Sequence, residues 1–152
     1  MKMESLAGKL TCITGASSGI GKACAIEFAK HKSNLLLMAR RKDRIDALAQ
    51  QLTREHHILT FTQQLDVRSN EDVERTFSSL PPEWKKIDVL VNNAGLSRGL
   101  DKLYEGKIQD WEEMIDTNVK GLLYVTRTVL PHMVERNNGH IINIGSIAGH
   151  QT

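Results

Sequence analysis

Short apolar segments alternate along the chain with longer segments in which apolar residues recur every three or four positions. The short segments predict five strands, at residues 10–14, 34–38, 58–65, 87–91 and 141–145. The longer segments predict four helices, one in each interval between strands. Because the strands carry apolar residues for both faces of a sheet, helices must cover both faces. The pattern therefore predicts an α/β fold with a doubly wound parallel sheet.

Polar residues mark where the predicted helices begin and end. Asp43, Ser69 and Asp110 each precede a helical pattern, which makes them predicted N-caps. Ser69 and Asp110 are also followed three residues later by an acid, in the manner of a capping box. The helix that begins at Asp110 is the longest. It is expected to run through Glu135 and to end at the Asn-Asn-Gly of residues 137–139.

Composition and charge narrow the class of protein. The 152 residues fit one domain, and no repeat or linker divides them. With 20 Lys and Arg against 18 Asp and Glu, the net charge of +2 offers no strong attraction to nucleic acid or to a membrane. The apolar run at 35–39 is far shorter than the roughly 20 residues that span a bilayer. Residues 1–10 lack the apolar core of a signal peptide, so a cytoplasmic protein is expected.

The metal-binding residue types do not form a recognisable site in the sequence. Cys12 and Cys24 belong to no Cys-x-x-Cys pair, and both are expected as thiols of the interior. His56 and His57 are adjacent, so their side chains would point in different directions. No metal site is predicted.

Three glycines follow the first predicted strand, in the segment TGASSGIG at residues 14–21. Gly15 permits a tight turn out of the strand, Gly19 lets the backbone approach a pyrophosphate, and Gly21 allows close packing of helix on strand. The following helix would direct its free N–H groups at the phosphates. The alternative is a tight turn that binds no ligand. A nucleotide P-loop is excluded, because Ala16 and Ala23 stand where it requires Gly and Ser or Thr.

Five motifs along the chain resemble those of the short-chain dehydrogenase/reductase family. They are the glycine segment, an Asp-Val pair after the third strand, Asn-Asn-Ala-Gly after the fourth, an Asn in the long helix and a Ser after the fifth strand. The resemblance implies a Rossmann fold that binds a nicotinamide dinucleotide. The cofactor-binding residues that it implies are Gly15, Ser17, Ser18, Gly19, Ile20, Gly21, Asp66, Val67, Asn93, Ala94 and Gly95.

The residues after the second strand favour NADP over NAD. In dinucleotide-binding folds an acid about 20 residues beyond the glycines binds the ribose 2′-hydroxyl of NAD. Here Arg40 and Arg41 occupy that place. A guanidinium attracts a 2′-phosphate through charge-assisted hydrogen bonds, and Ser17 is a candidate helper. The alternative is a solvated basic stretch, since Lys42 and Arg44 follow.

The resemblance also implies part of a catalytic site. Ser146 would orient the substrate oxygen, and Asn118 would hold a water in a proton relay. Without the resemblance, Ser146 would be interpreted as a turn residue and Asn118 as a polar helix residue that bonds nearby backbone. The family's Tyr-xxx-Lys pair is expected about a dozen residues after Ser146, and Thr152 is the last residue given. Tyr104 and Tyr124 have no Lys four residues later.

These residues lead to a first hypothesis and two alternatives. The segments LPPEW at 80–84 and MVER at 133–136 most resemble the NADP-dependent 3-hydroxy acid dehydrogenase, or serine dehydrogenase, branch. The first hypothesis is an NADP-dependent oxidoreductase acting on a small 3-hydroxy acid or its semialdehyde, homo-oligomeric when full-length. Residues 1–152 would then be a C-terminally truncated, five-strand Rossmann domain. The alternatives are an inactive module for cofactor binding or subunit pairing, and a non-redox Rossmann protein such as a methyltransferase.

Overall fold

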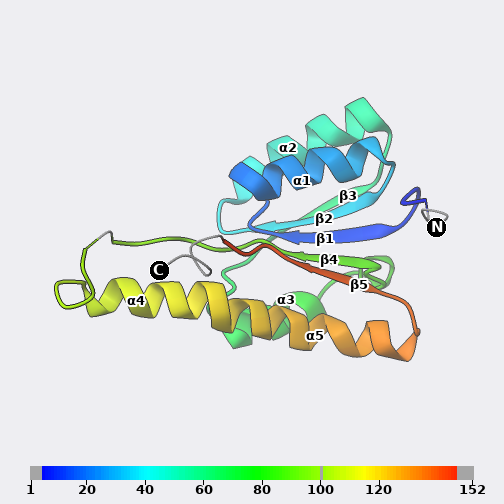
Figure 1. Ribbon diagram of the computed structural model, residues 1–152. Helices are drawn as coiled ribbons and strands as arrows, with labels where there is room; N and C mark the ends of the chain where they lie inside the picture. Colours follow the sequence, from blue (N-terminus) through cyan, green and yellow to red (C-terminus); the bar gives the residue numbers. More distant parts are fainter. Residues whose placement is uncertain (1–4, 100, 147–152) are drawn as a thin grey trace.

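Five parallel strands form one sheet in the order β3-β2-β1-β4-β5. The computed structural model describes residues 5–99 and 101–146 (Figure 1). Residues 147–149 of the motif that contains Ser146 therefore lie outside the described residues. The strands are β1 (Leu10–Thr14), β2 (Asn34–Ala39), β3 (Thr60–Gln64), β4 (Val89–Asn92) and β5 (His140–Asn143).

Helices lie on both faces of this sheet, as Figure 1 shows. α1 and α2 lie on one face, α3 and α5 lie on the other, and α4 continues the line of α5 beyond the end of the sheet. The prediction of a doubly wound parallel α/β sheet is confirmed. The helical elements are α1 (Gly19–Lys30), α2 (Lys42–His56), α3 (Asn70–Ser78), the short 3₁₀ helix η1 (Pro82–Trp84), α4 (Ile108–Ile115), the π-helical segment η2 (Asp116–Gly121) and α5 (Leu122–Glu135).

Successive side chains of the inner strands enter two separate apolar clusters. In β1, Cys12 packs into the cluster that also holds Val125 and Met133 of α5. Its neighbour Ile13 packs into the cluster that holds residues of α1 and α2, including Leu48. This alternation follows from the pleat, which points consecutive side chains to opposite faces. The run of consecutive apolar residues in β1 and β2 therefore reports a sheet covered on both sides.

Two of the three predicted N-caps are wrong. Ser69 is confirmed, since its hydroxyl accepts a hydrogen bond of 3.1 Å from the backbone N–H of Asp72. Asp43 and Asp110 instead lie within the first turn of α2 and α4, whose capping residues are Arg41 and Lys107. An acid in the first turn is favourable next to the positive end of the helix dipole. The same residue type therefore marks a helix start at either position.

The long helix predicted from Asp110 to Glu135 is interrupted. It begins earlier, at Ile108, and its α-helical hydrogen bonding changes to a π pattern over Asp116–Gly121 before α5 continues. A π turn accommodates one extra residue, and such turns occur frequently at functional sites. At the end of this segment Gly121 lies against Val67, because a Cβ on Gly121 would come within 2.6 Å of the Val67 side chain. The interruption therefore lies where the helix meets the chain that leaves β3.

Candidate cofactor and active site

The candidate site lies where the strand order changes direction. From β1 the chain adds β2 and β3 on one side, then crosses to add β4 and β5 on the other. The helices that follow β1 and β4 consequently leave toward opposite faces, as Figure 1 shows. In open α/β sheets ligands bind in the crevice at the carboxyl ends of the strands at such a point.

Two cavities meet at this edge. The first, here called the arginine pocket, has a volume of about 120 Å³ and is lined by Arg40, Arg41, Asp66 and Thr117 among others. The second, here called the serine groove, has a volume of about 770 Å³ and is lined by Asn118 and Ser146 among others. Both cavities are also lined by Gly15, Ser18, Ala94 and Gly95. Because they share these walls, the two cavities adjoin, and together they are here called the cleft.

The glycine segment forms the shared wall, and its glycines have different physical roles. Gly15 has a φ of +66°, and a Cβ there would lie 2.8 Å from the Cα of Ala94. A Cβ on Gly21 would collide with the Asn93 side chain and would lie 2.5 Å from the carbonyl oxygen of Gly15. Gly19 also has a positive φ, +54°, but a Cβ there would meet nothing within 4 Å. Gly15 and Gly21 thus serve packing within the protein, whereas Gly19 presents bare backbone to open space.

The N-terminus of α1 opens into the serine groove through Gly19 and Ile20. Ser18 is the N-cap residue, and within the described residues no side chain caps this helix end. The first turn of α1 also holds no acid. Free N–H groups and the helix dipole make such an end favourable for an anion.

Thr14 organises the opposite wall and was missed in the sequence. Its buried hydroxyl accepts hydrogen bonds of 3.1 Å from the backbone N–H groups of both Asn93 and Ala94. In return, the Asn93 side chain donates to the carbonyl oxygens of Thr14 and Gly15, at 3.0 and 3.2 Å. The turns after β1 and β4 therefore hold each other in place. The sequence feature that could have indicated this role is a Thr at the end of an apolar strand, directly before the first glycine.

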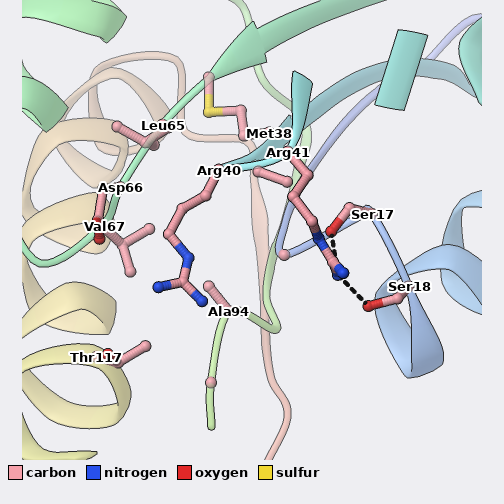
Figure 2. A pocket seen from close by; sticks show the side chains of 13 residues that line it. Ser17, Ser18, Met38, Arg40, Arg41, Leu65, Asp66, Val67, Ala94 and Thr117 are labelled. Atoms are coloured by element: carbon pink, nitrogen blue, oxygen red, sulfur yellow. Dashed lines mark hydrogen bonds between the residues drawn. The ribbon is translucent and has the colours of Figure 1, made fainter. Parts of the chain in front are cut away.

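The two arginines are in different states (Figure 2). Arg41 donates hydrogen bonds to the hydroxyls of Ser17 and Ser18, at 3.0 and 2.8 Å. The guanidinium of Arg40 points into the arginine pocket and donates no hydrogen bond to any described residue. Lys42 is not part of this group, since its ammonium bonds Asp46 at 2.6 Å and Thr62 at 2.8 Å. Of the consecutive basic residues 40–42, Arg40 and Arg41 therefore face the cleft, whereas Lys42 is held by residues outside it.

Asp66 and Val67 follow β3 and line the arginine pocket. The guanidinium of Arg68 bonds both carboxylate oxygens of Asp66. These hydrogen bonds are the main reason why the pKa of Asp66 lies below its usual value, and the charge of Arg40 lowers that pKa further. Asp66 is consequently ionised at neutral pH. Val67 is buried against the π-helical segment.

Asn118 lies in the π-helical segment, and its side chain is bound to the chain after β4. The amide oxygen accepts a 2.9 Å hydrogen bond from the N–H of Leu96, and the amide nitrogen donates a 2.8 Å bond to the Leu96 carbonyl. These bonds reach backbone 22 residues away in the sequence, outside the helix that carries Asn118. The side chain thus fixes the start of the loop that borders the serine groove. Asn118 and Ser146 line the same groove.

A buried polar ladder, which sequence reasoning missed, supports the strand that leads to Ser146. The amide nitrogen of Asn92 donates 2.9 Å hydrogen bonds to Thr126 of α5 and to the side chain of Asn143. Asn92 and Asn143 are paired in the register of β4 and β5. The amide oxygen of Asn92 is buried and has no partner among the described residues. These hydrogen bonds connect the ends of β4 and β5 to each other and to α5.

The structure places the predicted site residues along this cleft, with one exception. Gly21 lies beneath the wall and lines neither cavity. The residues that line the arginine pocket are Gly15, Ser17, Ser18, Arg40, Arg41, Asp66, Val67, Ala94 and Gly95, and those that line the serine groove include Gly19, Ile20, Asn93, Asn118 and Ser146. Their roles toward a ligand remain predictions.

Two other kinds of site are missing from residues 5–99 and 101–146. There, no three His, Cys, Asp or Glu side chains come together in a way that could hold a metal ion. In the same part of the chain, no helix has both the length and the apolar character needed to cross a bilayer.

Comparison with known proteins gives the family. The family model of the short chain dehydrogenases matches residues 9–152. The chain belongs to this family. Family membership leaves the methyltransferase hypothesis without support, and the resemblance stated from the sequence motifs is confirmed.

Similar proteins share both sequence and fold with this family member. It is 49% identical over 140 residues to the NADP-dependent 3-hydroxy acid dehydrogenase of Salmonella typhi. The aligned segment covers 92% of this chain and 55% of that protein. The crystal structure of serine dehydrogenase from Escherichia coli superimposes with a TM-score of 0.88 at 45% identity, over 94% of this chain and 64% of the other. The closed form of serine dehydrogenase complexed with NADP+ superimposes with a TM-score of 0.85 at 46% identity. This match covers 93% of this chain and 56% of the other. The chain thus spans about half the length of the curated relative.

Proposed function

We propose that this chain binds NADP(H) and forms the cofactor-binding part of a dehydrogenase that interconverts a hydroxyl and a carbonyl group. The observation that carries the proposal is the guanidinium of Arg40 in the arginine pocket, which donates no hydrogen bond to any described residue. Arg41 stands next to it, and both occupy the sequence position at which an acid would favour NAD. Two cations at this place suit a 2′-phosphate and not a bare ribose hydroxyl. The similar proteins named for NADP agree with this choice.

The residues present fit the whole dinucleotide. Gly19 offers open backbone and the N-terminus of α1 offers free N–H groups, which suits a pyrophosphate. Arg40 and Arg41 would hold the 2′-phosphate, while Asp66 and Val67 would border the adenine. The nicotinamide end would then enter the serine groove, where the cofactor supplies hydride chemistry. Asn93, Ala94 and Gly95 form the wall between the two ends.

The groups for substrate in this chain lie in the serine groove. We assign Ser146 the task of donating a hydrogen bond to the substrate oxygen, and Asn118 the task of fixing the loop beside it. Hydroxyl and amide groups hold and orient a carbonyl but do not supply a proton near neutral pH. By similarity to the named relatives, the proposed substrate is a small 3-hydroxy acid or its semialdehyde. We place the protein in the cytoplasm.

The test of this proposal is the preference between the two cofactors. Arg40→Ala and Arg41→Ala, singly and together, are titrated with NADPH and with NADH by isothermal calorimetry. Each charge-assisted hydrogen bond lost contributes about 1.5–3 kcal/mol, so NADPH affinity should fall roughly tenfold or more per residue while NADH affinity changes little. Lys42→Ala is the matched control, because it removes one adjacent cation whose ammonium is held by Asp46 and Thr62. Equal losses for the two cofactors would refute the proposal.

A second candidate function is a module that binds cofactor or pairs with other subunits without turnover. It is favoured by exposed apolar side chains along α4, the π segment and α5, which include Ile108, Ile115, Val119 and Leu123. Purified chain 1–152 would be tested for NADPH oxidation with a three-carbon semialdehyde, and its oligomeric state measured by sedimentation. Tight NADPH binding without oxidation would favour the module, whereas turnover would exclude it.

A further inference from the structure

The arginine pocket contains a carboxylate that opposes the ligand proposed for it. Asp66 lines the same cavity as Arg40 and is close enough for the charge of Arg40 to act on it. A carboxylate in such a position repels a 2′-phosphate and attracts the cation that should bind it. A pocket for a phosphorylated ribose therefore requires that Asp66 be neutralised by another group.

Arg68 supplies this compensation with a forked set of contacts. Its Nε lies 3.0 and 3.1 Å from the two carboxylate oxygens of Asp66, and its Nη2 lies 2.6 Å from one of them. The backbone N–H of Arg68 adds a fourth hydrogen bond of 3.2 Å to the same carboxylate. Bidentate pairs of this kind are the stronger and more directional ion pairs.

Two more charges hold Arg68 in this orientation. Its Nη1 lies 3.3 Å from Glu113 at the end of α4 nearer the pocket, and Glu113 in turn bonds Nε of Arg98 at 2.9 Å. The four side chains alternate in sign, so Asp66 and Glu113 are each matched by an arginine. Among the described residues that line the arginine pocket, the cations are Arg40 and Arg41, and neither forms a salt bridge with an acid.

We propose that Arg68 is a specificity-determining residue for the phosphorylated cofactor, acting through Asp66. By occupying both carboxylate oxygens of Asp66, it keeps Arg40 unpaired and available for a 2′-phosphate. Arg68 does not line either cavity, so it is a positioning residue and does not itself bind the cofactor. This inference rests on the proposed NADP(H) function and names a determinant of it outside the pocket wall.

The experiment measures the ratio of NADPH to NADH affinity in the 152-residue chain. Arg68→Gln releases one carboxylate toward Arg40 and the phosphate, and the ratio should fall roughly tenfold, since one charge at this range in a partly buried site acts on that scale. Arg68→Lys retains the charge and should retain most of the ratio. Arg75→Gln is the matched control, because it removes an exposed arginine of α3 that lies outside both cavities. Thermal unfolding of each variant records whether it is folded.

The double variant Asp66→Asn/Arg68→Gln decides whether Arg68 acts through Asp66. Without the carboxylate there is nothing to neutralise, so the double variant should recover the ratio of the Asp66→Asn single variant. A ratio that stays low in the double variant would overturn the inference, as would an unchanged ratio or an equal loss for both cofactors in folded Arg68→Gln. If Arg68→Gln alone does not fold, the double variant, which has no unpaired acid, still gives the deciding comparison. If the unmodified chain binds NADPH no more tightly than NADH, the proposed function itself fails, whatever Arg68 does.

Discussion

Replacing Thr14 by Val tests whether one buried hydroxyl holds the two ligand-binding turns together. Val has nearly the same shape as Thr, so the substitution opens no cavity. It removes the acceptor for the N–H groups of Asn93 and Ala94, and also a longer bond of 3.4 Å to the carbonyl of Val91. The two N–H groups belong to half-buried residues, so water can replace the lost acceptor only in part.

The expected loss follows from counting these bonds. At about 1 kcal/mol for each intramolecular hydrogen bond, and less for the longest one, Thr14→Val should lower the free energy of unfolding by about 2–3 kcal/mol. Thr14→Ser is the matched control, because it keeps the hydroxyl and removes one buried methyl group, which costs about 1 kcal/mol. The two variants should also differ in ligand binding. Thr14→Ser should bind NADPH like the unmodified chain, whereas Thr14→Val should bind it several-fold more weakly, because the turn after β4 loses its fixed position.

The assay is urea unfolding followed by circular dichroism, combined with NADPH titration of the folded variants. The slope of the free energy against urea should be the same for all three chains, so that midpoints report stability directly. If Thr14→Val is as stable as Thr14→Ser and binds NADPH equally well, the hydroxyl does not connect the two turns.

Three further predictions concern the same structure. Gly21→Ala should destabilise the chain by several kcal/mol in urea unfolding, because its Cβ would collide with the Asn93 side chain and lies close to backbone. Burial raises the pKa of the Cys12 thiol, so in the native chain at pH 8 an aromatic disulfide reagent should label the half-buried Cys24 first, and label both thiols only in denaturant. The pKa of Asp66 is lower folded than unfolded, so its contribution to stability is present above about pH 4 and is lost as the pH falls through the lower folded value. Asp66→Asn should therefore lose less stability than the unmodified chain between pH 5 and pH 3, and an identical loss would contradict the assignment.

The order of strands and helices could be predicted because it depends on periodicity, which is local. Buried strands such as β2 show consecutive apolar residues, and the edge strand β3 was recognisable although it proved shorter than predicted. Exact helix starts were harder to predict, because Asp43 and Asp110 are as favourable in a first turn as at an N-cap. Ser69 gave the correct start, since a short hydroxyl side chain bonds the N–H groups from the capping position itself.

The site was predictable in its residues but not in their pairing. Arg40 and Arg41 are equivalent in the sequence, yet only Arg41 bonds the serines of the glycine segment. The spacing predicts Glu113 as the partner of Asp110 in a capping box, whereas Glu113 pairs with Arg68 and Arg98. Such contacts join residues far apart in sequence, and nothing in local spacing distinguishes one charged partner from another.

The π-helical segment makes the effect of a deletion in the long helix depend on where the deletion falls. A π turn closes one full turn with one residue more than an α turn. Deleting one residue within Asp116–Gly121 would therefore leave an ordinary α turn, and α4 and α5 would keep their relative orientation. The residues of the turn itself would shift, so Asn118 would lose its place opposite Leu96. Deleting one residue in the regular helix on either side would instead rotate α4 against α5 by about 100°. Either the contacts of Glu113 or the core contacts of Val125 would then be lost.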